Sequence, residues 1–340
     1  MKRAHRLPLV SLALLFLPGC DRLPTGPPDG AGQLRTRGVT IADWTPGGVA
    51  SPAGFAAIDE IAATGADTVV FVVSIEQDTA TSSAPDPETT PRPDAFLAAA
   101  AHARGRGLAV GVKLHVEVRD GTWRAMIRPA DPATWFTAYG EVVRTWADAA
   151  TTADATWFAV GTELAGTCHL AGEWRRVIAD ARERFDGALT YAASWDEAER
   201  VTFWDALDFV GVDAYWPVAA RRDPSRLDAL AAWQPWLARV EALARRAGRD
   251  ILFTEIGYRS CDGAGMYPSD FRSPEPADPG EQEDLYWAAL QAIADTPDVA
   301  GIWWWSWELG TAGTGGPDDT GYTPRGKPAL DVLTAVWSSR

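Results

Sequence analysis

The feature that most constrains the fold is a regular alternation of short apolar runs with longer amphipathic segments. Continuous apolar runs are typical of strands buried on both faces, whereas the segments between them repeat at helical spacing. The predicted strands are residues 39–42, 68–73, 108–114, 157–160, 189–192, 209–212, 251–253 and 299–305. The predicted helices are residues 52–64, 94–104, 134–149, 173–184, 196–200, 227–247, 282–294 and 328–337. Repeated strand-then-helix units predict an α/β fold with a parallel sheet.

Such a sheet either stays open as a doubly wound sheet or closes into a (β/α)8 TIM barrel. No glycine-rich phosphate loop follows a predicted strand, and polar residues recur at the strands' C-terminal ends, which favours a single barrel over residues 38–340. Because these ends meet on one face of a barrel, the residues there are expected to line one cleft. They are Asp43, Trp44, His115, Glu163, Trp195, Tyr215, Glu255 and Trp305.

Two of the strands end in the same way. Residues 157–166 read WFAVGTELAG and residues 250–257 read DILFTEIG, so each places a glutamate, Glu163 or Glu255, directly after a threonine. Either glutamate alone is explained as well by a helix cap or a solvated loop. Two carboxylates at one end of a barrel are the catalytic groups that glycosidases use to cleave a glycosidic bond.

The composition limits the classes of substrate and binding partner that we expect. A formal net charge of −15 argues against nucleic acid, anionic lipid surfaces and phosphorylated substrates. The 17 tryptophans favour carbohydrate, because indole rings stack on the apolar faces of sugars. No HExxH motif or cysteine cluster is present, so no metal and no cofactor are expected.

The N-terminal segment, residues 1–20, has the organisation of an export signal. Basic residues precede an apolar run, 7–17, that is too short to span a membrane as a helix. The sequence LPGC that ends the segment resembles a bacterial lipobox, which implies lipid attachment at Cys20. Pro18 departs from the usual lipobox, so secretion without an anchor is the alternative.

Residues 21–37 are rich in proline and glycine and predict a flexible linker. We therefore expect an exported protein that is lipid-anchored at the bacterial cell envelope or otherwise secreted. Its only membrane contact would be the lipid anchor, and we expect a monomer.

Several stretches in one order resemble glycoside hydrolase family 113. They are KLHVEVRDGTW at 113–123, GTELAG at 161–166, LTYAASWDEAERVTFWDALDFVGVDAYWP at 189–217, FTEIGYRS at 253–260 and GKPA at 326–329. The resemblance covers the chain from residue 38 onward. It implies a retaining (β/α)8 hydrolase of a family composed mainly of endo-β-1,4-mannanases. It assigns the acid/base to Glu163 and the nucleophile to Glu255. Much of the wider clan has asparagine before the acid/base, where this chain has Thr162.

A retaining mechanism predicts that the two carboxyl groups lie about 5 to 5.5 Å apart. Glu163 must hold a proton, which burial beside Trp157 would favour, and Glu255 must stay ionised, for which Tyr215 is a candidate hydrogen-bond donor. Lys113 and His115 occupy alternate positions of one strand, so they share a face and are expected to bind sugar hydroxyls.

Sugar-stacking candidates are predicted among the tryptophans at the strand ends. They are Trp44, Trp195, Trp216, Trp303, Trp305 and Trp307. Strand alternation places Trp303, Trp305 and Trp307 on one face and Trp304 on the other, and we favour Trp305 as the platform.

Cys168 and Cys261 follow the two glutamates by five and six residues. Because paired cysteines in exported proteins are usually bonded, they predict a disulfide between the fourth and seventh loops.

The expected substrate is β-1,4-linked mannan or its oligosaccharides. Two alternatives remain open. One is a retaining glycosidase that acts on another β-linked polysaccharide or oligosaccharide, and the other is a non-catalytic glycan-binding lipoprotein. The sequence does not distinguish endo from exo cleavage.

Overall fold

The computed structural model describes residues 34–309 and 314–338. The predicted export signal and Cys20 lie outside the described residues. Strand β1 (Thr36–Ala42) begins inside the predicted linker, so the barrel starts before residue 38. Arg37 looks like a linker residue in the sequence, but it is buried because Asp67 and the carbonyl of Trp337 satisfy its guanidinium.

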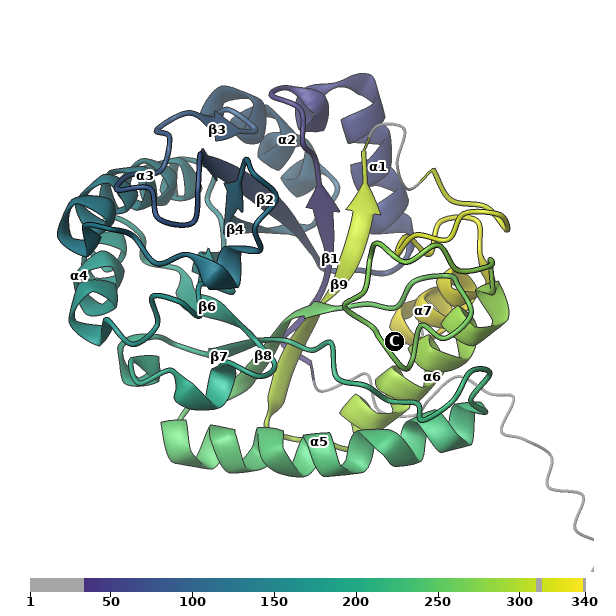
Figure 1. Cartoon of the computed structure of the whole chain (residues 1–340). Helices are drawn as coiled ribbons and strands as arrows, with labels where there is room; N and C mark the ends of the chain where they lie inside the picture. The colour runs from purple at the N-terminus through teal and green to yellow at the C-terminus, as the bar shows by residue number, and fades with distance from the viewer. Residues whose placement is uncertain (1–33, 310–313, 339–340) are drawn as a thin grey trace, which may run out of the picture.

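The predicted (β/α)8 barrel is confirmed (Figure 1). Its other strands are β2 (Thr68–Gln77), β4 (Ala109–Val118), β5 (Trp157–Thr162), β6 (Ala188–Ser194), β7 (Val210–Asp213), β8 (Ile251–Ile256) and β9 (Val299–Glu308). All pairings within the ring are parallel, and β1 closes it by pairing with both β9 and β2. A two-residue strand, β3 (Thr89–Thr90), adds antiparallel to β2.

The helices lie around the outside of this ring (Figure 1). They are α1 (Pro52–Ala63), α2 (Pro93–Gly105), α3 (Pro132–Thr152), α4 (Ala171–Arg182), α5 (Arg226–Ala247), α6 (Pro279–Ala294) and α7 (Pro328–Ser338). Between β6 and β7 the chain forms only 3-10 turns, at Ala198–Arg200 and Trp204–Ala206. Within the described ranges, we find no helix with the length and apolar character needed to cross a membrane.

The base of the barrel is filled by aromatic side chains. Trp157 on β5 and Trp303 on β9 come from strands that are not neighbours, yet their ring centroids are 6.1 Å apart, so the two rings meet inside the ring of strands. Phe209 packs against Trp157 in the same layer. Trp157 and Trp303 are therefore core residues, and Trp157 does not shield Glu163 as predicted.

The predicted alternation along β9 fails after Trp305. Val39 pairs with Trp304 and Ile41 with Trp307, so β9 has one residue more than β1 across this interval. Such a bulge reverses the facing of the residues that follow it. Trp307 accordingly packs in the helix layer, where its indole N–H donates to Glu60 of α1 at 3.1 Å.

Glycine at position 161 allows the helix layer to approach β5 closely. A Cβ at Gly161 would lie 2.9 Å from Cη2 of Trp174 and 3.2 Å from the hydroxyl of Tyr139. These side chains belong to α4 and α3, and the strand continues through Gly161 to Thr162. β5 therefore extends two residues past its predicted end at Val160, and Gly161 sets how tightly the strand is packed just before Glu163.

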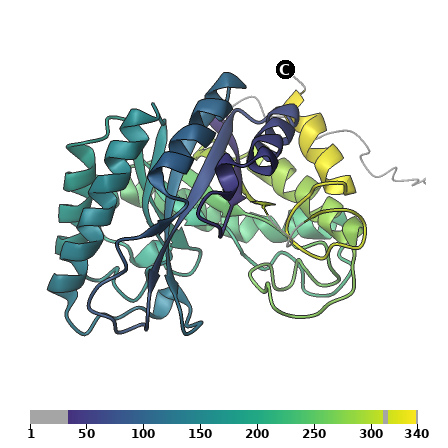
Figure 2. The ribbon, with the colours of Figure 1, turned by 90° about the horizontal axis from the view of Figure 1, so that it is seen from above.

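The segment that follows β8 and residues 314–327, which precede α7, lie side by side, at the lower right in Figure 2. The Ser260 N–H donates to the carbonyl of Gly321 at 3.0 Å, and the Arg259 guanidinium donates to the carbonyl of Thr320 at 3.1 Å. These contacts brace the end of the barrel at which Glu255 lies.

Candidate active site

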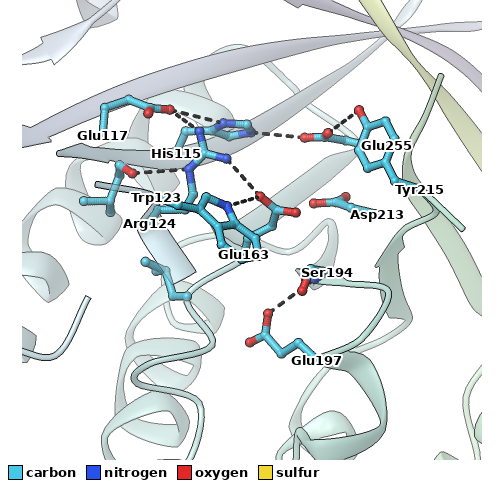
Figure 3. Close-up of polar contacts among 12 residues, drawn as sticks. His115, Glu117, Trp123, Arg124, Glu163, Ser194, Glu197, Asp213, Tyr215 and Glu255 are labelled. Atoms are coloured by element: carbon cyan, nitrogen blue, oxygen red, sulfur yellow. Dashed lines mark hydrogen bonds and ion pairs between the residues drawn. The ribbon is translucent and has the colours of Figure 1, made fainter. Parts of the chain in front are cut away.

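Glu255 lies on β8 with only 7% of its side chain exposed. The Lys113 ammonium of β4 lies 2.5 Å from its Oε1, and the Tyr215 hydroxyl donates to its Oε2 at 2.7 Å. Figure 3 shows the Tyr215 and Glu255 side chains directed toward each other. Both carboxylate oxygens thus have a donor, and Tyr215 occupies the position predicted for it.

Lys113 does not have the sugar-binding role that the sequence predicts. Its ammonium lies within hydrogen-bond distance of Glu255 Oε1, of Asp213 Oδ1 at 3.2 Å and of the Thr254 carbonyl at 3.0 Å. An ammonium group has three donors, so all are used within the protein. The side chain is fully buried, and its charge lies against Glu255 and Asp213.

The pKa values of Glu255 and Asp213 are shifted in opposite directions. Burial alone would raise the pKa of Glu255, but the Lys113 charge and the donated hydrogen bonds outweigh it and lower the pKa. Burial and then the charge of Glu255 hold the pKa of Asp213 well above its ordinary value. The Lys113 charge therefore favours the ionised form of Glu255, whereas burial favours the protonated form of Asp213.

Glu163 follows β5 and has 13% of its side chain exposed. Its Oε2 lies 3.0 Å from Nη1 of Arg124 and accepts the Trp123 indole N–H at 3.2 Å (Figure 3). The Arg124 guanidinium is itself fixed by Glu117 and by the carbonyl of Val116. The segment after β4 thus places two donors on one oxygen of Glu163.

The environment of Glu163 shifts its pKa in the opposite direction from that of Glu255. Burial raises the pKa of Glu163, Arg124 lowers it, and the negative charge of Glu255 raises it again, with a net upward shift. One glutamate therefore favours its proton and the other its charge. This division is what a pair of carboxyl groups needs to act as acid and nucleophile.

His115 and Trp305 complete the space beside Glu255. Their rings are stacked with centroids 5.7 Å apart and planes 7° from parallel. Burial and the charge of Arg124 lower the pKa of His115 to about 4, so the ring is neutral near pH 7. Its Nε2 lies 3.6 Å from Glu255 Oε1. The structure thus brings Trp305, His115 and Glu255 together, as predicted from three separate strands.

The remaining candidate aromatics occupy different layers. Trp44 follows β1 and is 48% exposed. Trp195 packs edge-on against Trp236 of α5 with centroids 5.8 Å apart, and Trp216 is stacked on the same Trp236 ring at 5.9 Å. Trp195 and Trp216 are thereby part of the packing between the strands and α5. Asp43 uses both oxygens to hold the turn after β1, accepting from the N–H groups of Thr45 and Val49.

The predicted disulfide is wrong: Cys168 and Cys261 are both free and buried. In the ring, β6 and β7 stand between β5 and β8. The segment after β5 places Cys168 near Glu197, whereas Cys261 pairs with Ala277 within the segment after β8. Similar spacing from the two glutamates therefore does not make the thiols neighbours.

One group of carboxylates within the described residues has the spacing for a metal ion. Oxygens of Asp223, Asp278 and Glu281 lie within 4.8 Å of one another. Asp278 caps α6, and Glu281 accepts the N–H groups of Gly263 and Gly265. These contacts explain the group as a brace for the segment after β8.

The sequence does not predict the contacts that Trp123, Arg124 and Asp213 make in the site. Trp123 and Asp213 lie in stretches that resemble the family, and Arg124 directly follows one of them, but nothing in these stretches indicates which side chain touches a glutamate. Thr162, which stands where the wider clan often has asparagine, has a buried hydroxyl for which we find no hydrogen-bond partner among the described residues. It therefore takes no part in the contacts around Glu163.

A (β/α)8 barrel that presents two glutamates with opposite pKa shifts at one end has the form of a glycoside hydrolase. The family model described as Glycoside Hydrolase Family 113 matches residues 44–327, and the chain belongs to this family. It is therefore a glycoside hydrolase with a glycan substrate. No curated protein sequence matches the chain significantly.

Solved structures support the assignment. The chain is similar to the β-mannanase AaManA from Alicyclobacillus acidocaldarius in complex with ManMIm, with 27% identity over 89% of this chain and 97% of that one and a TM-score of 0.80. Two structures of a family 113 β-1,4-mannanase give 25% and 26% identity and TM-scores of 0.81 and 0.82. Each match covers 90% of this chain and 99% or 100% of the other.

Proposed function

We propose that this protein is a retaining hydrolase of β-1,4-linked mannan or manno-oligosaccharides, with Glu255 as nucleophile and Glu163 as acid/base. The observation that carries the roles is the opposite direction of the two pKa shifts. The substrate follows the β-1,4-mannanases to which the chain is similar.

In the first step, Glu255 attacks the anomeric carbon while Glu163 donates its proton to the departing glycosidic oxygen. The proton that Glu163 donates is carried by its Oε1. Trp123 and Arg124 are obligate donors, and both point at Oε2, so Oε2 is the acceptor oxygen. The leaving group is therefore expected on the Oε1 side of Glu163.

The second step reverses the role of Glu163. Once Glu255 has become an ester, its negative charge no longer raises the pKa of Glu163, while the Arg124 charge remains. The pKa of Glu163 falls, and its carboxylate takes a proton from the water that attacks the glycosyl-enzyme. The product keeps the configuration of the substrate.

Two side chains in the site have polar atoms that are candidates for hydrogen bonds to the sugar hydroxyls. His115 has both ring nitrogens buried, and Asp213 has one buried oxygen, Oδ2, for which we find no hydrogen-bond partner within the described ranges. They replace Lys113 as the candidate polar contacts, and Trp305 offers a stacking face beside them.

The test is a panel of β-mannan, glucan and galactan, with product configuration followed by NMR. We expect hydrolysis of β-mannan with the β-anomer formed first, and loss of activity by about 10³-fold or more in Glu163→Gln and Glu255→Gln. Inversion would contradict the mechanism, and preference for another polysaccharide would contradict the substrate. Full activity of either variant would contradict the residue roles.

A further inference from the structure

Glu163 has an unusual backbone. Of the described residues other than glycine, three have positive φ: Asp154 at 51°, Glu163 at 52° and Asp223 at 47°. Short aspartate side chains tolerate this left-handed region, whereas for glutamate it costs about 1–2 kcal/mol. Something in the surrounding structure must therefore hold the chain in this conformation.

The hydrogen bonds around Glu163 identify what holds it. The Glu163 N–H donates to the carbonyl of Ala192 at 2.7 Å. The next N–H, that of Leu164, donates to the hydroxyl of Tyr191 at 2.7 Å. A side chain of β6 thereby fixes the peptide bond that follows Glu163.

Tyr191 is in turn held by Glu197. Its hydroxyl donates to Oε1 of Glu197 at 2.7 Å, and the Ser194 N–H lies 3.3 Å from Oε2. Both Tyr191 and Glu197 are fully buried. The Leu164 N–H, the Tyr191 hydroxyl and the Glu197 carboxyl therefore form one chain of donors and acceptors, which we name the Tyr191–Glu197 brace.

We propose that the Tyr191–Glu197 brace is a positioning device that holds Glu163 in its left-handed conformation, so that the acid/base meets the glycosidic oxygen. This inference rests on the proposed function of Glu163. Neither Tyr191 nor Glu197 touches Glu255 or the Glu163 carboxyl in the described contacts, so their effect passes through the backbone.

The chemistry of Glu197 fits this role. The pKa of Glu197 is raised to about 8, mainly by burial and in part by the charge of Glu163. The Tyr191 hydrogen bond and the charge of Arg200 act in the opposite direction but are outweighed. Near pH 7 Glu197 is therefore a neutral acid, whose Oε1 accepts the Tyr191 hydroxyl. A neutral amide with the same shape can do the same.

The test compares two substrates in each variant. A manno-oligosaccharide needs the proton of Glu163, whereas a 2,4-dinitrophenyl β-mannobioside has a leaving group that departs without it. The ratio of kcat/KM for the two substrates reports acid catalysis. It does not depend on the fraction of molecules that are folded, so partial unfolding cannot imitate the effect.

For Tyr191→Phe we expect the ratio, oligosaccharide over dinitrophenyl substrate, to fall about tenfold or more, since misplacement by an ångström is this costly. Tyr139→Phe is the matched control. Tyr139 is equally buried, and its hydroxyl donates to the Val160 carbonyl of β5 at 2.8 Å. Its ratio should change less than about twofold. Equal ratios in the two variants would overturn the proposal.

Glu197 is tested by a pair of variants. Glu197→Gln keeps an oxygen acceptor for Tyr191 and should retain most of the ratio, whereas Glu197→Leu should lower it as Tyr191→Phe does. Equal ratios in these two would overturn the role of Glu197. Glu163→Gln, assayed in parallel, separates the two hypotheses: if it retains full activity, the proposed function fails and not the brace alone.

Discussion

At the scale of single residues, one lysine decides how the proposed nucleophile behaves. Glu255 and Asp213 are both buried, and burial together with their mutual repulsion favours the protonated form of each. Lys113 places a positive charge between them and lies closest to Glu255. Because the Lys113 charge favours the anion, the pKa of Glu255 is lowered, and Glu255 is ready to attack at neutral pH.

Lys113→Met should therefore raise the pKa of Glu255. Ionised Glu255 would then appear only at higher pH, so the acidic limb of the kcat/KM profile moves to higher pH, and activity at pH 6 falls by about 10²-fold. The pH dependence of mannan hydrolysis measures this. Lys327→Met is the control, since Lys327 is also buried and ion-paired, but with Asp319. An acidic limb that stays in place in Lys113→Met would contradict the role of Lys113.

At the scale of elements, the ends of β5 and β8 deliver the two glutamates, and packing from outside sets how each strand sits. Trp174 and Tyr139 press against Gly161 of β5, two residues before Glu163. On β9, a bulge turns Trp307 outward while Trp305 faces His115. Irregular points in the strands thus determine which side chains reach the site.

Gly161→Ala should destabilise the fold, because the new Cβ would overlap the indole ring of Trp174 and force it to move. We expect a loss of about 1–3 kcal/mol in the free energy of unfolding, measured by denaturant titration, and a lower kcat. Gly172→Ala in α4 is the control, since a Cβ there has nothing within 4 Å. Its stability should be unchanged or raised by up to about 1 kcal/mol. Equal stability of the two variants would contradict the steric argument.

At the scale of the whole molecule, β1 closes the barrel. It pairs in parallel with β2 on one side and β9 on the other, and without it both would become open edges. β1 therefore matters as much as the last strand, although its first two residues, Thr36 and Arg37, look like linker in the sequence.

Truncation tests this closure. A chain that begins at residue 34 retains β1 and should melt cooperatively and hydrolyse mannan like the full chain. A chain that begins at residue 43 lacks β1 and should aggregate or show no cooperative transition, because the barrel cannot close. Calorimetry and size-exclusion chromatography measure both outcomes. A cooperative, active chain from residue 43 would show that closure by β1 is dispensable.

The sequence by itself determined the order of the elements and the face on which the site lies. Buried parallel strands leave a continuous apolar signature, and their C-terminal ends meet on one face whatever the details of packing. Glu163 and Glu255 were therefore recognisable from their positions after two strands, and Tyr215 from its place after a third.

Only the tertiary structure decided which side chains tune the two glutamates. Lys113 meets residues 100 and 142 positions away in the chain, and Arg124 meets Glu163 across 39. Such contacts depend on distances across the barrel and on bulges and turns that leave no periodic signal in the sequence. For the same reason, the sequence predicts a disulfide between Cys168 and Cys261 that the structure does not form, because two strands lie between the segments that carry the two cysteines.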